Sequence, residues 1–242
     1  MTRLFVPMPL LPETLVELPP AAAHRVRAVL RARSGDSLTL FDGTGGEYPA
    51  WIRSCTHTRV TVETGTLHAS ERESGLALTL AQGVARGERM DYTLQKAVEL
   101  GVTRIVPLAT TRSQIKLEGE RAARRLAHWQ GIIIHACEQC GRNRVPAIAA
   151  ISTLGSFLAT DDAALRLTLA PGAAHDLRGL LCGQKSFSLV IGPEGGLADD
   201  ELAQLAVAGY SAVRLGPRIL RTETAALVAL TALQVLAGDL CE

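Results

Sequence analysis

The sequence lacks any long hydrophobic run. No stretch reaches the roughly 18 uninterrupted apolar residues of a membrane-spanning helix, and no apolar core follows a basic segment near the start, as in a secretory signal. The five cysteines, at positions 55, 137, 140, 182 and 241, are odd in number and scattered, which does not indicate a disulfide framework. We therefore expect a cytoplasmic protein that has no membrane partner.

An excess of charge of either sign is also missing. The 242 residues include 25 basic and 24 acidic side chains, for a formal net charge of +1, so the molecule as a whole exerts no general attraction on nucleic acid. Only three of the basic residues are lysine, and the arginines supply planar, paired donors that suit phosphate. Hydrophobic residues make up 47% of the chain, which is enough for a core and excludes a mainly disordered protein.

The first part of the chain differs in pattern from the rest. Short alternating runs predict strands at 38–41, 48–52 and 59–63, and helical spacing predicts a helix at 21–33. The polar stretch 68–75 has no periodicity and is the best linker candidate. We therefore expect a first domain of residues 1–72 and a second domain of residues 73–242.

Strands alternate with helices in the second domain. We expect strands at 76–81, 103–108, 165–169, 187–191 and 211–215, and helices at 88–100, 118–139, 153–159, 198–208 and 225–236, the last capped by Thr222. This alternation is typical of an α/β fold with a mostly parallel sheet. Such sheets bind ligands at the carboxyl ends of their strands, which directs attention to the loops that follow the strands.

Two of these loops are candidates for a ligand pocket. Residues 192–196 follow a buried strand, and their glycines allow a ligand to approach the backbone, although a plain strand-to-helix turn has the same spacing. The loop has neither the GxGxxG nor the GxxxxGK[ST] spacing, and the anionic Glu194 argues against a phosphate. Residues 215–225 also follow a strand and open a helix, so the two loops could line one pocket; alone, the second is a solvated helix start.

A third stretch, 136–146, closes a long basic segment. From position 112 to 144 seven basic residues stand against three acidic ones. Arg142, Asn143 and Arg144 could offer donors to phosphates and base edges, and a solvated basic helix is the alternative. Cys137 and Cys140 form a single CxxC pair with no second pair of ligands, so we expect no metal. No nucleophile elbow and no spaced pair of carboxylates is present.

Four long motifs, in order, carry a resemblance that covers essentially the whole chain. They are RGERMDYTLQKAVELGV (86–102), ACEQCGRNRVP (136–146), IGPEGGL (191–197) and LGPRILRTETAAL (215–227), with LTLFDGTGGEY (38–48) in the first domain. They resemble the bacterial 16S ribosomal RNA uridine-N3 methyltransferases of the SPOUT class. The resemblance implies a PUA-like β-barrel for RNA, then a SPOUT α/β domain with a trefoil knot, and a homodimer. It also implies S-adenosylmethionine as methyl donor and, as substrate, a decoding-region uridine of 16S rRNA in the small ribosomal subunit.

The same resemblance assigns the cofactor to three loops, 167–171, 192–196 and 215–224. The residues that it assigns to cofactor binding are Leu169, Ile191, Gly192, Pro193, Glu194, Gly195, Gly196, Leu215, Gly216, Ile219, Leu220, Arg221, Thr222 and Thr224. In the first loop the family pattern has a histidine before the proline, where this chain has Ala170. A side-chain role at that position is therefore not expected.

The implied reaction needs a group that removes the proton of uracil N3 or stabilises the resulting anion. Glu223, Glu194 and Glu138 are the available bases, and we rank Glu223 first because it opens a helix beside the cofactor loop. Arg221 is the candidate for stabilising the uracil anion or for holding a phosphate. The residues that we expect to bind RNA are Arg25, Arg27, Arg31, Arg33, Arg142, Asn143 and Arg144.

Two other functions compete with this interpretation. A non-catalytic RNA-binding or assembly factor would keep the fold and lose the cofactor, and the intact glycine loops weigh against it. A related enzyme could methylate a ribose 2′-hydroxyl or transfer RNA instead. The GRNRVP and RTET segments resemble the uridine-N3 group more closely.

Overall fold

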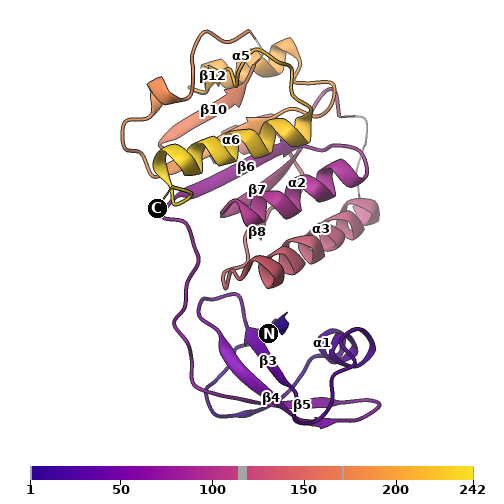
Figure 1. Ribbon diagram of the computed structural model, residues 1–242. Helices are drawn as coiled ribbons and strands as arrows, with labels where there is room; N and C mark the ends of the chain where they lie inside the picture. The colour runs from indigo at the N-terminus through magenta and orange to yellow at the C-terminus, as the bar shows by residue number, and fades with distance from the viewer. Residues whose placement is uncertain (1, 114–118, 171, 242) are drawn as a thin grey trace. The chain divides into compact units, whose positions relative to one another are not determined.

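The computed structural model describes residues 2–113, 119–170 and 172–241, and the chain forms two compact units (Figure 1). The first unit comprises Met1–Glu73 and Cys137–Val145, and the second comprises Ser74–Ala136 and Pro146–Glu242. The second segment of the first unit is the last turn of a long helix and the loop after it. Within the described part of the chain, no helix is long and apolar enough to cross a membrane.

The first unit is built on a five-stranded sheet. Its strand order is β1 (Thr2–Phe5), β3 (Ser37–Phe41), β4 (Tyr48–Cys55), β5 (Val60–Thr64) and β2 (Leu15–Glu17). β1 and β3 are parallel, and the other neighbours are antiparallel. The sequence pattern predicted β3, β4 and β5 and missed the short strands β1 and β2. Leu4, Leu40, Ile52 and Val62 are fully buried between the sheet and the neighbouring helix, together with Val26.

That helix is shorter than its sequence predicted. α1 (Pro20–His24) continues into a single π-helical turn, η1 (Arg25–Val29), instead of running to residue 33. The Leu30 amide donates to the Arg25 carbonyl across five residues, and Arg31 has a left-handed backbone, with φ of 51°. A left-handed residue cannot continue a right-handed helix, so the regular structure ends before Arg31.

The second unit contains a wholly parallel sheet. Its strand order is β12 (Ser211–Val213), β10 (Leu165–Leu169), β11 (Ser186–Ile191), β6 (Ala77–Gly83), β7 (Arg104–Ala109) and β8 (Ala147–Ile148), with β9 (Ser152–Thr153) also paired to β7. Every pairing in it is parallel. The α/β fold with a parallel sheet, predicted from the alternation of strands and helices, is therefore confirmed.

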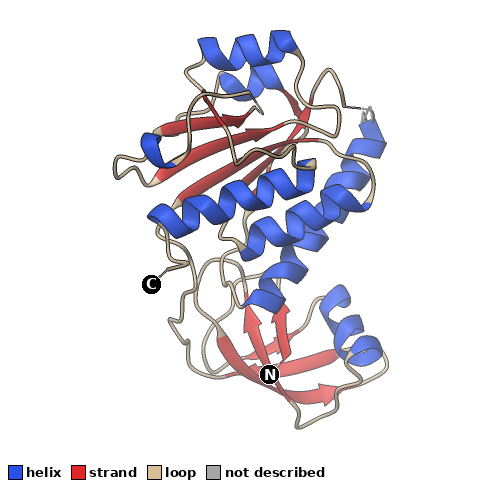
Figure 2. Ribbon diagram, turned by 45° about the horizontal axis from the view of Figure 1, so that its top comes forward, coloured by secondary structure: helices blue, strands red, loops and turns tan. Residues whose placement is uncertain are grey.

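Helices cover both faces of this sheet, which is how a parallel sheet is buried (Figure 2). On one face, Ala81, Val106 and Val190 pack with α4 (Leu154–Leu158) and α5 (Asp199–Val207). Gln82, the neighbour of Ala81, bonds instead to the first residue of α6 (Thr222–Ala237). Because successive strand residues point to opposite faces, α6 covers the second face, where it packs on α2 (Glu88–Glu99).

The other predicted elements agree with the structure to within a few residues, and the two-residue strands β8 and β9 were not predicted. α3 spans Gly119–Cys140, and Glu118, its predicted first residue, lies outside the described residues. A short 3₁₀ turn, η2 (Arg178–Leu180), was not predicted. α6 begins at Thr222, with Arg221 at the N-cap position. The prediction that Thr222 caps this helix is therefore wrong, because its hydroxyl is bonded elsewhere, to the Gly192 carbonyl, at 2.6 Å.

Candidate functional site

A pocket of about 670 Å³ opens where three neighbouring strands of the second unit end. β12, β10 and β11 are adjacent in the sheet, and the residues at their carboxyl ends, Val213, Leu169 and Ile191, all line the pocket. Its remaining walls come mainly from the loop after β11 and from the segment between β12 and α6. This is the position at which open α/β sheets bind ligands.

The glycine-rich loop after β11 is packed so closely that side chains are excluded. A Cβ on Gly192 would lie 2.8 Å from the Gly196 carbonyl carbon and from the Leu197 nitrogen. A Cβ on Gly83, at the end of β6, would lie 2.6 Å from the Pro193 nitrogen. Backbone atoms cannot yield as a flexible side chain can, so the glycines are required for the loop to fold over the strand ends.

A buried hydrogen-bond network connects the two main walls of the pocket. Gln82, with no exposed surface, donates from Nε2 to the Thr222 hydroxyl at 2.9 Å. The Thr222 hydroxyl donates in turn to the Gly192 carbonyl. The side chain of Gln82, near the end of β6, therefore fixes the glycine-rich loop and the start of α6 relative to each other. Gln82 was not among the residues predicted from the sequence.

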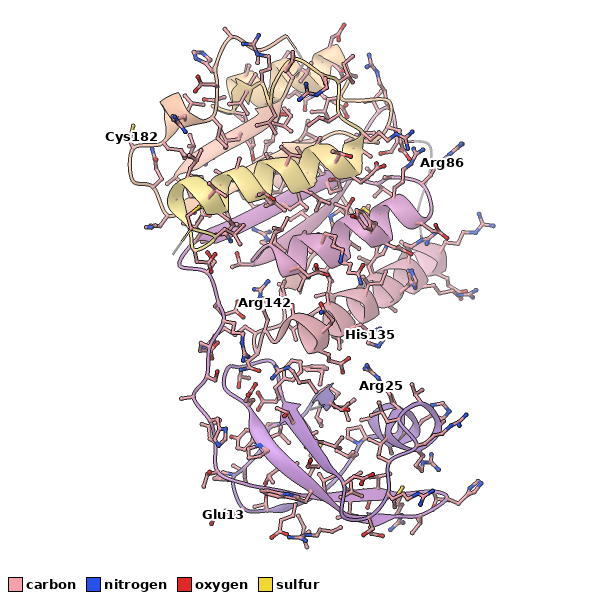
Figure 3. All side chains as sticks on the ribbon, viewed as in Figure 1. Glu13, Arg25, Arg86, His135, Arg142 and Cys182 are labelled. Atoms are coloured by element: carbon pink, nitrogen blue, oxygen red, sulfur yellow. The ribbon has the colours of Figure 1, made fainter. Side chains whose placement is uncertain are left out.

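Glu194 is fixed to the start of α2 rather than free in the pocket. Its Oε1 accepts a hydrogen bond from the Arg86 amide at 2.9 Å and one from the Arg89 guanidinium at 3.1 Å; Arg86 is labelled in Figure 3. Partial burial opposes ionisation, but these donors outweigh it and hold the pKa of Glu194 below its usual value. Glu194 is therefore an anion held in place by its two donors, and it is a poor proton acceptor.

Glu223 has the opposite environment. It lies in the first turn of α6 and lines the pocket. Its Oε2 is buried and has no hydrogen-bond partner among the described residues. A buried acceptor without a partner is costly, so a donor that reached this oxygen would be stabilised. Arg221, one residue before α6, is exposed and also lines the pocket.

The structure brings most of the expected cofactor residues together. Of those assigned in the sequence analysis, only Thr224 is not in the pocket wall, and Pro171, at the end of the first expected loop, lies outside the described residues. Two further lining residues, Ala170 and Arg218, lie in the expected loops but were not singled out individually. The lining residues outside those loops, which were not predicted, are Arg89, Arg112, Leu197, Asp199, Leu202, Val213, Arg214 and Ala225. Val213 and Arg214 end or directly follow a strand, and that position is the signal that could have identified them.

Two residues expected to bind RNA are instead buried within the first unit. Arg142 (Figure 3) is 4% exposed and donates to the Glu73 carboxylate at 2.5 Å, and Asn143 is fully buried. Asn143 donates to the Ser70 carbonyl and accepts from Arg3, both at 2.6 Å. The expectation that Arg142 and Asn143 contact RNA is therefore wrong, because their donors and acceptors are used inside the fold.

Glu138 has a structural environment as well. It is 7% exposed, accepts from the Phe5 amide at 3.0 Å and pairs with Arg25. The pocket wall does not include Glu138. The expectation that Glu138 is a candidate catalytic base is therefore corrected, because its carboxylate already binds the last turn of α3 to β1 and η1.

The other arginines of the first unit differ in their availability. Arg31, Arg33 and Arg144 are exposed, and Arg144 lies 3.6 Å from Glu71. Arg25 is half-buried in its pair with Glu138, and Arg27 donates to the Ala23 carbonyl.

In the described ranges, no group of three or more His, Cys, Asp or Glu residues could hold a metal ion. Burial raises the pKa of the Cys137 thiol to about 12.

Comparison with known proteins gives the class of this fold and pocket. A family model described as an RNA methyltransferase domain matches residues 72–234, which include every residue of the pocket. A protein of Buchnera aphidicola named "Ribosomal RNA small subunit methyltransferase E" is 31% identical, over 93% of this chain and 92% of its own length.

Two solved structures are similar over almost their full length. A putative methyltransferase of Legionella pneumophila, in complex with S-adenosylmethionine, is 40% identical with a TM-score of 0.96, over 99% of both chains. A ribosomal RNA small subunit methyltransferase E of Neisseria gonorrhoeae, bound to S-adenosylmethionine, is 40% identical with a TM-score of 0.91, also over 99% of both chains. The chain belongs to the ribosomal RNA small subunit methyltransferase E family of RNA methyltransferases.

Proposed function

We propose that this protein transfers a methyl group from S-adenosylmethionine to N3 of a uridine in 16S rRNA of the small ribosomal subunit. The observation that carries the proposal is the pocket at the ends of β10, β11 and β12. It belongs to a chain 40% identical to two proteins whose structures contain S-adenosylmethionine. The choice of uracil N3 rests on the resemblance of the GRNRVP and RTET segments to the uridine-N3 group.

The pocket suits this methyl donor. Leu169, Ile191, Leu215 and Leu220 give it apolar walls for an adenine ring, and the glycine-rich loop offers backbone groups. No phosphate-binding glycine motif is present in the sequence, and the cofactor has no phosphate. When bound, S-adenosylmethionine supplies a methyl group attached to a positively charged sulfur.

Glu223 is our candidate for the proton acceptor. Its unpartnered buried Oε2 accepts the proton of uracil N3, and the freed electron pair forms the new bond to the methyl carbon as the carbon–sulfur bond breaks. Arg221, one residue before α6, stabilises the negative charge that develops on the uracil. Glu194, whose pKa is lowered, stays ionised and holds the glycine-rich loop.

The finer features of the fold are part of the proposal. Residues 1–72 form a PUA-like RNA-binding barrel, to which Arg25, Arg27, Arg31, Arg33 and Arg144 contribute basic groups. Residues 73–242 form a SPOUT domain with a trefoil knot. The path of the chain supports the knot. After β11 the chain continues to β12, which lies beyond β10 in the sheet, and α6 then returns to pack on β11 and α2. We further propose that the protein acts as a homodimer in the cytoplasm.

The experiment is methyl transfer from labelled S-adenosylmethionine to small ribosomal subunits from a strain that lacks this protein, followed by nucleoside analysis. Naked 16S rRNA serves as the parallel substrate. Label in 3-methyluridine is the expected result. Label in a ribose-methylated nucleoside would move the reaction to the 2′-hydroxyl, and RNA binding without transfer or cofactor binding would make the protein a non-catalytic factor.

A further inference from the structure

The pocket rim carries more positive charge than the methyl donor can use. Five exposed arginines line the pocket (Arg89, Arg112, Arg214, Arg218 and Arg221), against three carboxylates (Glu194, Asp199 and Glu223). Glu194 is already paired with Arg89. S-adenosylmethionine has one carboxylate and no phosphate, so it can engage one guanidinium strongly and leaves the others for a different anionic ligand.

Two of these arginines have no ion-pair partner in the described part of the chain. Arg214 and Arg218 are exposed, and neither forms an ion pair with a described residue. Arg112 donates through one nitrogen to the Gly195 carbonyl at 3.1 Å. A guanidinium has five N–H donors, so this bond orients Arg112 over the glycine-rich loop and leaves most of its donors available.

These arginines approach the pocket from two sides. Arg112 follows β7, whereas Arg214 and Arg218 follow β12. β7 and β12 lie on opposite sides of β11 in the sheet, and the loop after β11 lines the pocket. An extended anionic chain that crosses the mouth would therefore meet guanidinium groups on both sides of that loop.

We infer that this rim binds the phosphates that flank the target nucleotide, with Arg112 on one side and Arg214 and Arg218 on the other. The inference rests on the proposed function and deepens it: the substrate at the site is a single-stranded RNA segment whose target base turns into the pocket. These arginines of the second unit, and not the buried Arg142 and Asn143 of the first unit, contact the RNA backbone at the pocket.

An apolar side chain on the same rim fits an RNA strand. Ile219 lies between Arg218 and the pocket wall residue Leu220 and is 85% exposed. An isolated exposed isoleucine is not unusual, but here it stands next to the unpaired Arg218 at the pocket mouth. It provides an apolar surface for a base or ribose face, while Arg218 binds the adjoining phosphate.

The test compares the double variant R214A/R218A and the variant R112A with R178A, an exposed arginine of the second unit outside the pocket wall. Binding to unmodified small ribosomal subunits is measured at several salt concentrations, with KM and kcat for transfer and the Kd for S-adenosylmethionine. Removing one side chain that binds a phosphate of a single strand lowers the slope of log K against log salt by about 0.7. We expect the slope to fall by about twice that amount in the double variant.

We also expect KM for subunits to rise about tenfold or more in the double variant, since removing each ionic interaction weakens binding. The salt slope and KM should change by more than the Kd for S-adenosylmethionine does, and R214K/R218K should restore most of the salt slope. A double variant that behaves like R178A, or one that loses cofactor binding, would overturn the inference. Absence of transfer by the unaltered protein would instead contradict the proposed function.

Discussion

Two clusters of charged and polar residues are similar in composition but differ in whether the fold provides partners for them. In the first unit, Arg142, Asn143 and Glu138 are buried, and each has a close partner from a distant part of the chain. In the pocket of the second unit, Arg214, Arg218 and Glu223 are on loops or a helix start, and the Glu223 Oε2 lacks a partner among the described residues. Charged residues that the fold already satisfies hold it together, and those it leaves unsatisfied are available to ligands.

The largest expected difference in kcat is between two Glu→Gln variants, one from each cluster. We expect Glu223→Gln to lower kcat about a thousandfold at neutral pH, because loss of a general base typically costs between about a hundredfold and ten thousandfold. Glu138→Gln should leave kcat almost unchanged. The deficit of Glu223→Gln should shrink as pH rises, because hydroxide can then remove the N3 proton. Measured pH–rate profiles that coincide for Glu223→Gln and the unaltered protein would exclude Glu223 as the base.

The second comparison concerns stability. Arg142→Ala leaves the Glu73 carboxylate without its buried partner, and breaking such a pair costs about 3 kcal/mol. Arg144→Ala removes an exposed pair with Glu71 and should cost less than about 1 kcal/mol. Urea unfolding of both variants checks this difference. Equal losses of unfolding free energy in the two variants would mean that the buried pair of Arg142 stabilises the fold no more than the exposed pair of Arg144.

A smaller effect is expected at Gln82. It is buried, like the residues of the first cluster, but it bonds to a residue of the pocket wall. Gln82→Leu removes the donor to the Thr222 hydroxyl, and a hydrogen bond of this kind contributes about 1 kcal/mol. We expect the Kd for S-adenosylmethionine to rise about fivefold. Calorimetric titration measures it, with Gln234→Leu as the control, since Gln234 is equally buried on α6 but outside the pocket wall. An unchanged Kd would give Gln82 a purely structural role.

The sequence predicted the parts of the site that are contiguous in the chain. The loop at 192–196 and the segment 215–225 both follow strands, and this position made them candidate walls of one pocket, with a plain turn and a solvated helix start as the alternatives. Arg89 and Arg112 could not be found in this way, because they approach the pocket only through the sheet order that places β6 beside β11 and β7 beside β6. A charge run likewise does not reveal that Arg142 finds its partner in Glu73, 69 residues away.

The limits of the fold prediction have similar causes. β1 and β2 are short strands, of four and three residues, and pairing with β3 and β5 stabilises them. The helix predicted at 21–33 has the expected apolar spacing, but the backbone turns at Arg31. Thr222 resembles a helix cap in the sequence, yet its hydroxyl bonds the glycine-rich loop, a contact made across 30 residues.

Our main proposal is that the pocket at the ends of β10, β11 and β12 holds the methyl donor. Its most direct test is the Kd for S-adenosylmethionine in Gly192→Ala, whose new Cβ would lie 2.8 Å from backbone atoms of the loop. Gly155→Ala in α4, where a Cβ meets nothing within 4 Å, is the matched control. We expect Gly192→Ala to weaken binding about tenfold or more, because the loop that lines the pocket must move to admit the new Cβ, and we expect Gly155→Ala to bind normally. Equal affinity in a folded Gly192→Ala protein would contradict it.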